Sequence, residues 1–122
     1  MDQIQTENIP IIETNYKSSE FDTLFLETID YTFSTLLGND AKPIIFSFLD
    51  KKYKLSKKDI PGRISDFVNG VEQIFGTSAT LLELVVMKNL KKSVPSFNYS
   101  AKSPDLSFEG YADSLRKHIE NL

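Results

Sequence analysis

The clearest structural signal in this chain lies in residues 64–76, which read Ile-Ser-Asp-Phe-Val-Asn-Gly-Val-Glu-Gln-Ile-Phe-Gly. Apolar side chains recur here at intervals of three and four residues, from Ile64 to Phe75. This spacing places them on one face of an α-helix. Gly76 follows directly, and a glycine in this position commonly ends a helix. The stretch therefore predicts an amphipathic helix that ends at Gly76.

Two further helices are predicted upstream. The first begins near Ser19, whose hydroxyl suits an N-cap, and ends at Gly38. Its apolar stripe consists of Phe21, Leu24, Phe25, Ile29, Phe33 and Leu36. The second helix has Asp40 as its cap and Pro43 in its first turn, where a missing amide hydrogen costs nothing. Its apolar face consists of Ile44, Ile45, Phe48 and Leu49, closed by Tyr53.

The segment from Leu55 to Pro61 is predicted to link the second helix to the third. Ile60 precedes a proline, which disfavours the helical conformation, so the end of this link is expected to be extended or turned.

Two more helices are predicted downstream. Thr77 or Ser78 caps the fourth, whose apolar residues between Leu81 and Leu90 point in almost every direction, as in a central, buried helix. A strand at residues 84–86 is the competing interpretation, but no second strand-like run is present to pair with it. Residues 95–104 have the composition of a loop. The last helix carries a continuous apolar seam, which predicts that it packs on a groove of its own domain or of a twin subunit: Phe108, Tyr111, Ala112, Leu115, Ile119 and Leu122.

Residues 1–18 are polar apart from Ile9, Ile11 and Ile12, and Pro10 interrupts them. They are predicted to form a flexible N-terminal arm, with docking of the isoleucines on a partner as the alternative. Residues 19–122 are then a single domain. The predicted fold class is all-α, a compact bundle of about five helices.

The composition excludes several kinds of protein. The chain has 122 residues, no cysteine and a net charge of −3. Disulfides and thiolate metal sites are therefore excluded, and a cytoplasmic location is expected. The charge does not favour an anionic membrane, and no apolar run is long enough to span one, so no membrane partner is expected.

No arrangement of residues typical of an active site is recognisable. His118 is the only histidine, and its place near a helix C-terminus is favoured by the helix dipole alone. No pair of carboxylates falls on an apolar stripe, where burial would raise a pKa for acid–base work. No glycine-rich phosphate loop is present. The chain is therefore expected to be no enzyme and to hold no cofactor or metal.

The strongest charge feature is a cluster of five lysines around one tyrosine: Lys51, Lys52, Tyr53, Lys54, Lys57 and Lys58. Such a cluster suits phosphates or an acidic partner, and Tyr53 is suited to stacking on a base. The alternative interpretation is a helix C-terminus stabilised by cations, followed by a solvated link. The cluster lacks arginine, which does most base-edge reading, and this weighs against sequence-specific recognition of nucleic acid.

Several short motifs together resemble a known family. These are Leu36-Leu37-Gly38, Tyr53-Lys54-Leu55, Asp59-Ile60-Pro61, Phe67, and the run from Glu72 to Ala79. They resemble the Nitrosopumilus output domain family, small helical domains of ammonia-oxidising archaea, over roughly residues 20–118. The resemblance implies an all-α fold and a role in signal transduction, and it carries over no catalytic residue. This chain departs from family members that are joined to receiver or sensor modules.

The leading functional hypothesis is a non-enzymatic protein-interaction or output module of archaeal signal transduction. A homodimer is expected, because the last helix has a continuous seam and the fourth is apolar all round. Two alternatives stay open. One is a nucleic-acid-associated protein that uses the lysine cluster, and the other is a small-ligand sensor with a pocket between helices.

Overall fold

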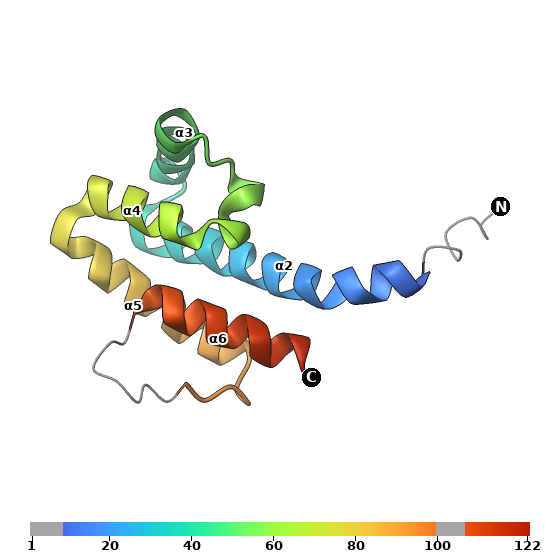
Figure 1. Cartoon of the computed structure of the whole chain (residues 1–122). Helices are drawn as coiled ribbons and strands as arrows, with labels where there is room; N and C mark the ends of the chain where they lie inside the picture. The colour runs from blue at the N-terminus through green and yellow to red at the C-terminus, as the bar shows by residue number, and fades with distance from the viewer. Residues whose placement is uncertain (1–8, 100–106) are drawn as a thin grey trace.

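The computed structural model describes residues 9–99 and 107–122, which form five α-helices and no strand. The α-helices are α2 (Ile9–Leu37), α3 (Ala41–Tyr53), α4 (Ile64–Phe75), α5 (Ala79–Ser93) and α6 (Phe108–Glu120). Two short 3-10 helices join them, η1 (Lys57–Gly62) and η2 (Gly76–Ser78). The helices pack into a compact arrangement (Figure 1). The predicted all-α bundle is confirmed.

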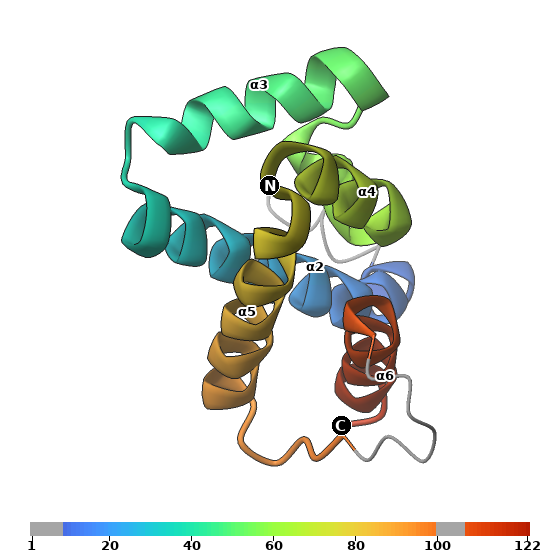
Figure 2. The ribbon, with the colours of Figure 1, turned by 90° about the vertical axis from the view of Figure 1, so that its left-hand side faces the viewer.

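Helix α2 is the central element. It passes between α3 and α4 on one side and α5 and α6 on the other (Figures 1 and 2), and it contacts α3, η1, α5 and α6. Phe21, Phe25, Ile29 and Phe33 are at most 1% exposed, so the predicted stripe is the spine of the core. Leu36 departs from it and is 47% exposed, because the stripe passes beyond the covering helices near the end of α2.

The start of this helix differs from the prediction. Helix α2 begins at Ile9, and Ser19 lies inside it rather than capping it. Pro10 falls in the first turn, where a proline is tolerated, and no glycine interrupts the chain before Gly38. Residues 9–18 of the predicted arm are therefore helical, and residues 1–8 lie outside the described residues.

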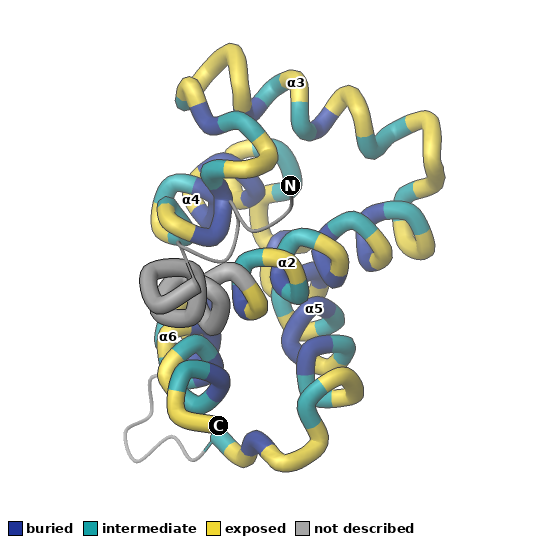
Figure 3. Tube along the Cα trace, turned by 90° about the vertical axis from the view of Figure 1, so that its right-hand side faces the viewer, coloured by how far each residue is buried: buried dark blue, intermediate teal, exposed yellow. Residues whose placement is uncertain are grey.

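Helix α5 is not the central, buried helix that its sequence predicts. Its contacts with α2, α4 and α6 cover one side, on which Leu82, Val86 and Leu90 are buried. On the other side Leu81 is 64% exposed and Leu84 is 48% exposed. In Figure 3, buried, intermediate and exposed positions alternate along α5, as on a helix with one covered face.

Helix α3 and the link after it hold two smaller corrections. Asp40 stands at the N-cap of α3 but makes no side-chain capping hydrogen bond, and Ile44 is 69% exposed rather than part of the apolar face. The predicted link consists largely of η1, and Leu55, Ile60 and Pro61 are buried in it. The link is thus part of the core, not a solvated connection.

Helix α6 closes the bundle from the C-terminal end. The Ser107 hydroxyl accepts a hydrogen bond from the Gly110 amide at 2.9 Å and caps the helix. The predicted seam is buried from Phe108 to Ile119, against the chain's own α2, α4 and α5. Leu122 was expected to extend the seam, but it lies beyond the helix end and is 70% exposed.

Candidate functional site

The five lysines of the predicted cluster lie together at the end of α3 and the start of η1. Lys51 and Lys52 are in the last turn of α3, Lys54 is its C-cap residue, and Lys57 and Lys58 open η1. All five are exposed. We call these five residues the basic surface.

One lysine of the basic surface is engaged with the rest of the fold. Lys57 donates a hydrogen bond to Asp30 Oδ1 at 2.9 Å, and its ammonium lies 5.2 Å from the centre of the Phe46 ring. Lys42 donates to the other oxygen of Asp30 at 3.0 Å. The hydrogen bond from Lys57 is the main reason that the pKa of Asp30 is lowered. The other four lysines form no ion pair with any described residue.

Two carbonyl groups at the end of α3 accept hydrogen bonds from Arg63 and not from the lysines. The Arg63 guanidinium donates to the carbonyl oxygens of Tyr53 at 2.9 Å and Lys54 at 2.8 Å. The Leu55 amide donates to the Leu49 carbonyl at 3.2 Å. These bonds hold the chain reversal in which Lys54 adopts a left-handed conformation, with φ of 53°.

Tyr53 is held against α4. Its hydroxyl donates to Gln73 Oε1 at 2.6 Å, and its ring meets Phe48 edge to face, with the centroids 6.4 Å apart. The side chain is half-buried. The base-stacking role suggested by its place among lysines is therefore not supported by its packing.

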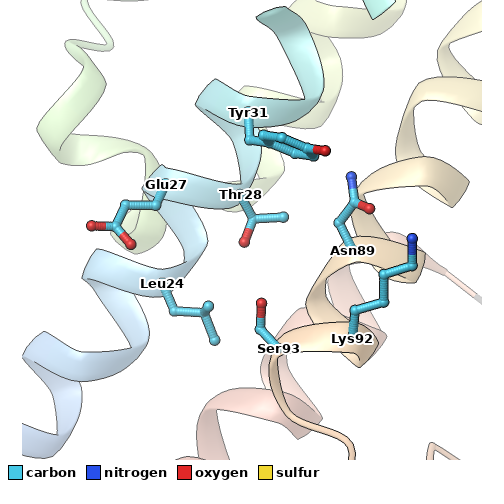
Figure 4. A pocket seen from close by; sticks show the side chains of 7 residues that line it. All are labelled: Leu24, Glu27, Thr28, Tyr31, Asn89, Lys92 and Ser93. Atoms are coloured by element: carbon cyan, nitrogen blue, oxygen red, sulfur yellow. The ribbon is translucent and has the colours of Figure 1, made fainter. Parts of the chain in front are cut away.

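A second candidate site is a groove of about 260 Å³ between α2 and α5 (Figure 4). It is lined by Leu24, Glu27, Thr28, Tyr31, Asn89, Lys92 and Ser93. We call it the α2–α5 groove. No sequence pattern points to this groove, because its two walls lie about sixty residues apart along the chain and neither carries a recognisable motif.

The polar groups of the α2–α5 groove are anchored to the core at one point. Asn89 Nδ2 donates to Thr32 Oγ1 at 3.0 Å, and Thr32 is fully buried. Thr28, one turn earlier on α2, is only 6% exposed. Buried hydroxyl and amide groups in a helix contact require hydrogen-bond partners. The hydrogen bond between Asn89 and Thr32 therefore determines which sides of α2 and α5 face each other.

One carboxylate has a raised pKa that the sequence analysis did not anticipate. Oε2 of Glu83 is buried without a hydrogen-bond partner among the described residues. Burial raises the pKa of Glu83, and the carboxylates of Glu72 and Glu109 raise it further. The three residues come from α5, α4 and α6, so only the folded chain brings them together. The described residues contain no group of carboxylates and histidines arranged to hold a metal ion.

His118 lies beside a serine. Its Nε2 atom is 3.0 Å from Ser96 Oγ, and its ring packs on Phe97 with the centroids 5.3 Å apart. A catalytic Ser–His pair normally needs a carboxylate that orients the histidine ring. No such hydrogen bond to His118 occurs among the described residues. The contact between Ser96 and His118 joins the loop after α5 to α6.

Comparisons with known proteins add no relative. No protein-family model, no curated protein and no solved structure matches this chain. Among the described helices, none has the length and apolar character needed to cross a membrane.

Proposed function

We propose that this chain is a non-enzymatic interaction module that docks on an acidic segment of a partner protein through its basic surface. The observation that carries the proposal is the state of Lys51, Lys52, Lys54 and Lys58. They are exposed, and none of them forms an ion pair with a described residue.

The structural explanation for such lysines is weakened by Arg63. Cations at a helix C-terminus usually stabilise its last carbonyl groups. At the end of α3 the carbonyl groups of its last residue, Tyr53, and of its C-cap residue, Lys54, already accept hydrogen bonds from the Arg63 guanidinium. The side chains of the four lysines donate no hydrogen bond to a described residue, so their ammonium groups are free for a partner.

An acidic protein segment fits this surface better than a nucleic acid. Proteins that bind single strands combine lysines or arginines with aromatic rings that present a face to the bases. Tyr53 is the aromatic residue that lies among the lysines in the sequence, and its ring packs on Phe48 while its hydroxyl is hydrogen-bonded to Gln73. A carboxylate-rich peptide requires only the charges.

The wider role follows from the resemblance described above. The Nitrosopumilus output domain family implies signal transduction, and we propose that the module acts there, in the archaeal cytoplasm, as an adaptor or output domain. The residues of the resemblance are largely structural, so this part of the proposal rests on the family and not on the basic surface.

The proposal is tested by fluorescence anisotropy with a labelled ten-residue polyglutamate peptide as the probe. Lys52 and Lys58 are replaced together by glutamine, and we expect the affinity for the peptide to fall about tenfold or more. The matched control replaces Lys88 and Lys117, exposed lysines of α5 and α6, which makes the same change in net charge.

Equal losses in the two double variants would mean that the peptide senses only the net charge, which would overturn the proposal. A single-stranded DNA of equal charge serves as the competing probe. Tighter binding of this DNA than of the peptide, lost on changing Lys52 and Lys58, would favour the nucleic-acid alternative instead.

A further inference from the structure

The α2–α5 groove exists because small polar residues face each other there. Thr28 on α2 and Ser93 on α5 are too short to fill the space between the helices. On its other side α2 meets α6 through large rings, with the centroids of Phe25 and Phe108 5.9 Å apart. Large side chains that meet in a helix interface fill the space between the helices. Pairs of small polar side chains leave a space that is lined by hydrogen-bonding groups.

Five polar groups converge on the α2–α5 groove. In Figure 4 the hydroxyl groups of Thr28, Tyr31 and Ser93 lie around its centre, with the Asn89 amide and the Lys92 ammonium along the α5 wall. Asn89 Nδ2 donates its hydrogen bond to Thr32 Oγ1 at 3.0 Å, so the side-chain oxygen of Asn89 remains available as an acceptor. The groove therefore offers several neutral donors and acceptors and one cation.

The charge balance of the α2–α5 groove favours an anion. Lys92 forms no ion pair with a described residue. Glu27 contributes to the rim, but its carboxylate points away from the centre (Figure 4). The C-terminal end of α5 opposes an anion with roughly half a charge, which the full charge of Lys92 outweighs.

The size of the α2–α5 groove limits its ligand. Its volume of about 260 Å³ is below the usual range for drug-sized ligands. A ligand of this groove is therefore a small molecule.

We propose that the α2–α5 groove binds a small hydroxylated anion, a short polyol that carries one phosphate or carboxylate group. Lys92 and Ser93 receive the anionic group, and Thr28, Tyr31 and Asn89 bind the hydroxyl groups. This site lies on α2 and α5, away from the basic surface of α3 and η1, and it does not depend on the function proposed above.

The test is a titration of the 15N-labelled protein with glycerol 3-phosphate, followed by amide chemical shifts. Inorganic phosphate and glycerol are titrated separately. We expect saturable shifts in residues 24–31 and 89–93, with glycerol 3-phosphate binding more tightly than either fragment. Lys92→Gln, a change at the exposed rim that leaves the fold intact, is expected to weaken binding about tenfold or more.

Two further variants locate the site. Lys52→Gln on the basic surface is expected to leave the affinity for glycerol 3-phosphate unchanged, and Thr28→Val, at nearly equal volume, is expected to reduce it severalfold. Shifts confined to residues 51–58 would overturn the inference, as would unsaturated shifts at tens of millimolar ligand. Equal affinities for inorganic phosphate and glycerol 3-phosphate would also overturn it, because the hydroxyl groups would then contribute nothing.

Discussion

Gly70 lies where α4 packs against α3. The residue is buried, and a β-carbon placed on it would overlap with Leu49 Cδ2 and lie 3.3 Å from Cε2 of Tyr53. Leu49 is fully buried, so its side chain shifts only by displacing its core neighbours. From the sequence alone Gly70 is an ordinary helix-interior glycine, where alanine is favourable if it does not clash. The structure shows the clash.

Gly70→Ala is therefore expected to lower the free energy of unfolding by about 1–3 kcal/mol, the usual cost of overpacking a core. Gly76→Ala is expected to lower the free energy of unfolding by about 1–2 kcal/mol for a different reason. Gly76 has φ of 59°, which strains a residue with a β-carbon. Nothing lies within 4 Å of an added β-carbon, so this cost comes from the backbone and not from a clash. Urea denaturation measures both. In the double variant Gly70→Ala with Leu49→Ala, the clash is absent. A loss of stability smaller than the sum of the losses in the two single variants would identify the clash as the cause. A neutral Gly70→Ala would contradict the packing described here.

Glu83 predicts a pH dependence with a defined sign. Its pKa in the folded protein is raised above the ordinary value of 4.5, mainly by burial. A raised carboxyl pKa penalises the folded state at pH values above it, and the penalty disappears as the pH falls towards 4.5. Glu83→Gln is therefore expected to be more stable than the wild type at pH 7, with the difference shrinking at pH 4.5. Denaturant titrations at the two pH values measure it, and a difference that grows on acidification would refute the assignment.

At the scale of elements, the sequence predicted helices best where a cap or stop and a one-sided apolar pattern agreed. The end of α4 at Phe75 follows from such agreement, and the buried seam of α6 follows from its apolar pattern alone. The pattern failed for α5, since hydrophobicity alone does not say which of its leucines meets another helix. It failed at the start of α2, because Ser19 is acceptable both as a cap and inside a helix.

The candidate sites likewise differ in how far a local sequence pattern predicts them. The exposure of the basic surface follows from a local run of lysines, which no core tolerates. The α2–α5 groove depends on Thr32 meeting Asn89 across 57 positions of the chain, and the environment of Glu83 depends on three helices at once. Pairings of this kind are set by the packing and are not encoded in any one segment.

Arg116 joins three elements. Its guanidinium lies 4.6 Å from the centre of the Phe21 ring on α2 and donates a hydrogen bond to the Pro61 carbonyl of η1. Arg116→Met keeps the apolar stem and removes both interactions, so we expect a loss of about 1–2 kcal/mol in the free energy of unfolding. Lys117→Met is the control, since Lys117 is 70% exposed and pairs only with Asp113 within its own helix. Similar losses in both variants would show that Arg116 acts only as a surface charge.

At the scale of the whole molecule, a homodimer was expected from the apolar seam of α6 and from the apolar residues all round α5. The structure removes the first reason and limits the second to one face of α5. The seam of α6 is covered by the chain's own helices. The outer face of α5, with Leu81 and Leu84, is still uncovered within the described chain. Exposed leucines on one helix face are common in interfaces between subunits.

We therefore expect a homodimer that forms through the outer face of α5. Light scattering at high micromolar concentration is expected to give the mass of two chains, and Leu81→Lys with Leu84→Lys is expected to give one. Ile44→Lys, at an exposed isoleucine of α3, is the control and leaves the dimer intact. A monomer mass for the wild type would contradict the expectation.

The central position of α2 also affects how the chain is made. Phe21 and Phe25 leave the ribosome more than eighty residues before Phe108 and Arg116, which contact them. During synthesis the spine of the core therefore stays uncovered on that side until α6 has emerged. A nascent chain that stalls before α6 leaves Phe21 and Phe25 exposed, which makes it a natural client for chaperones and proteases.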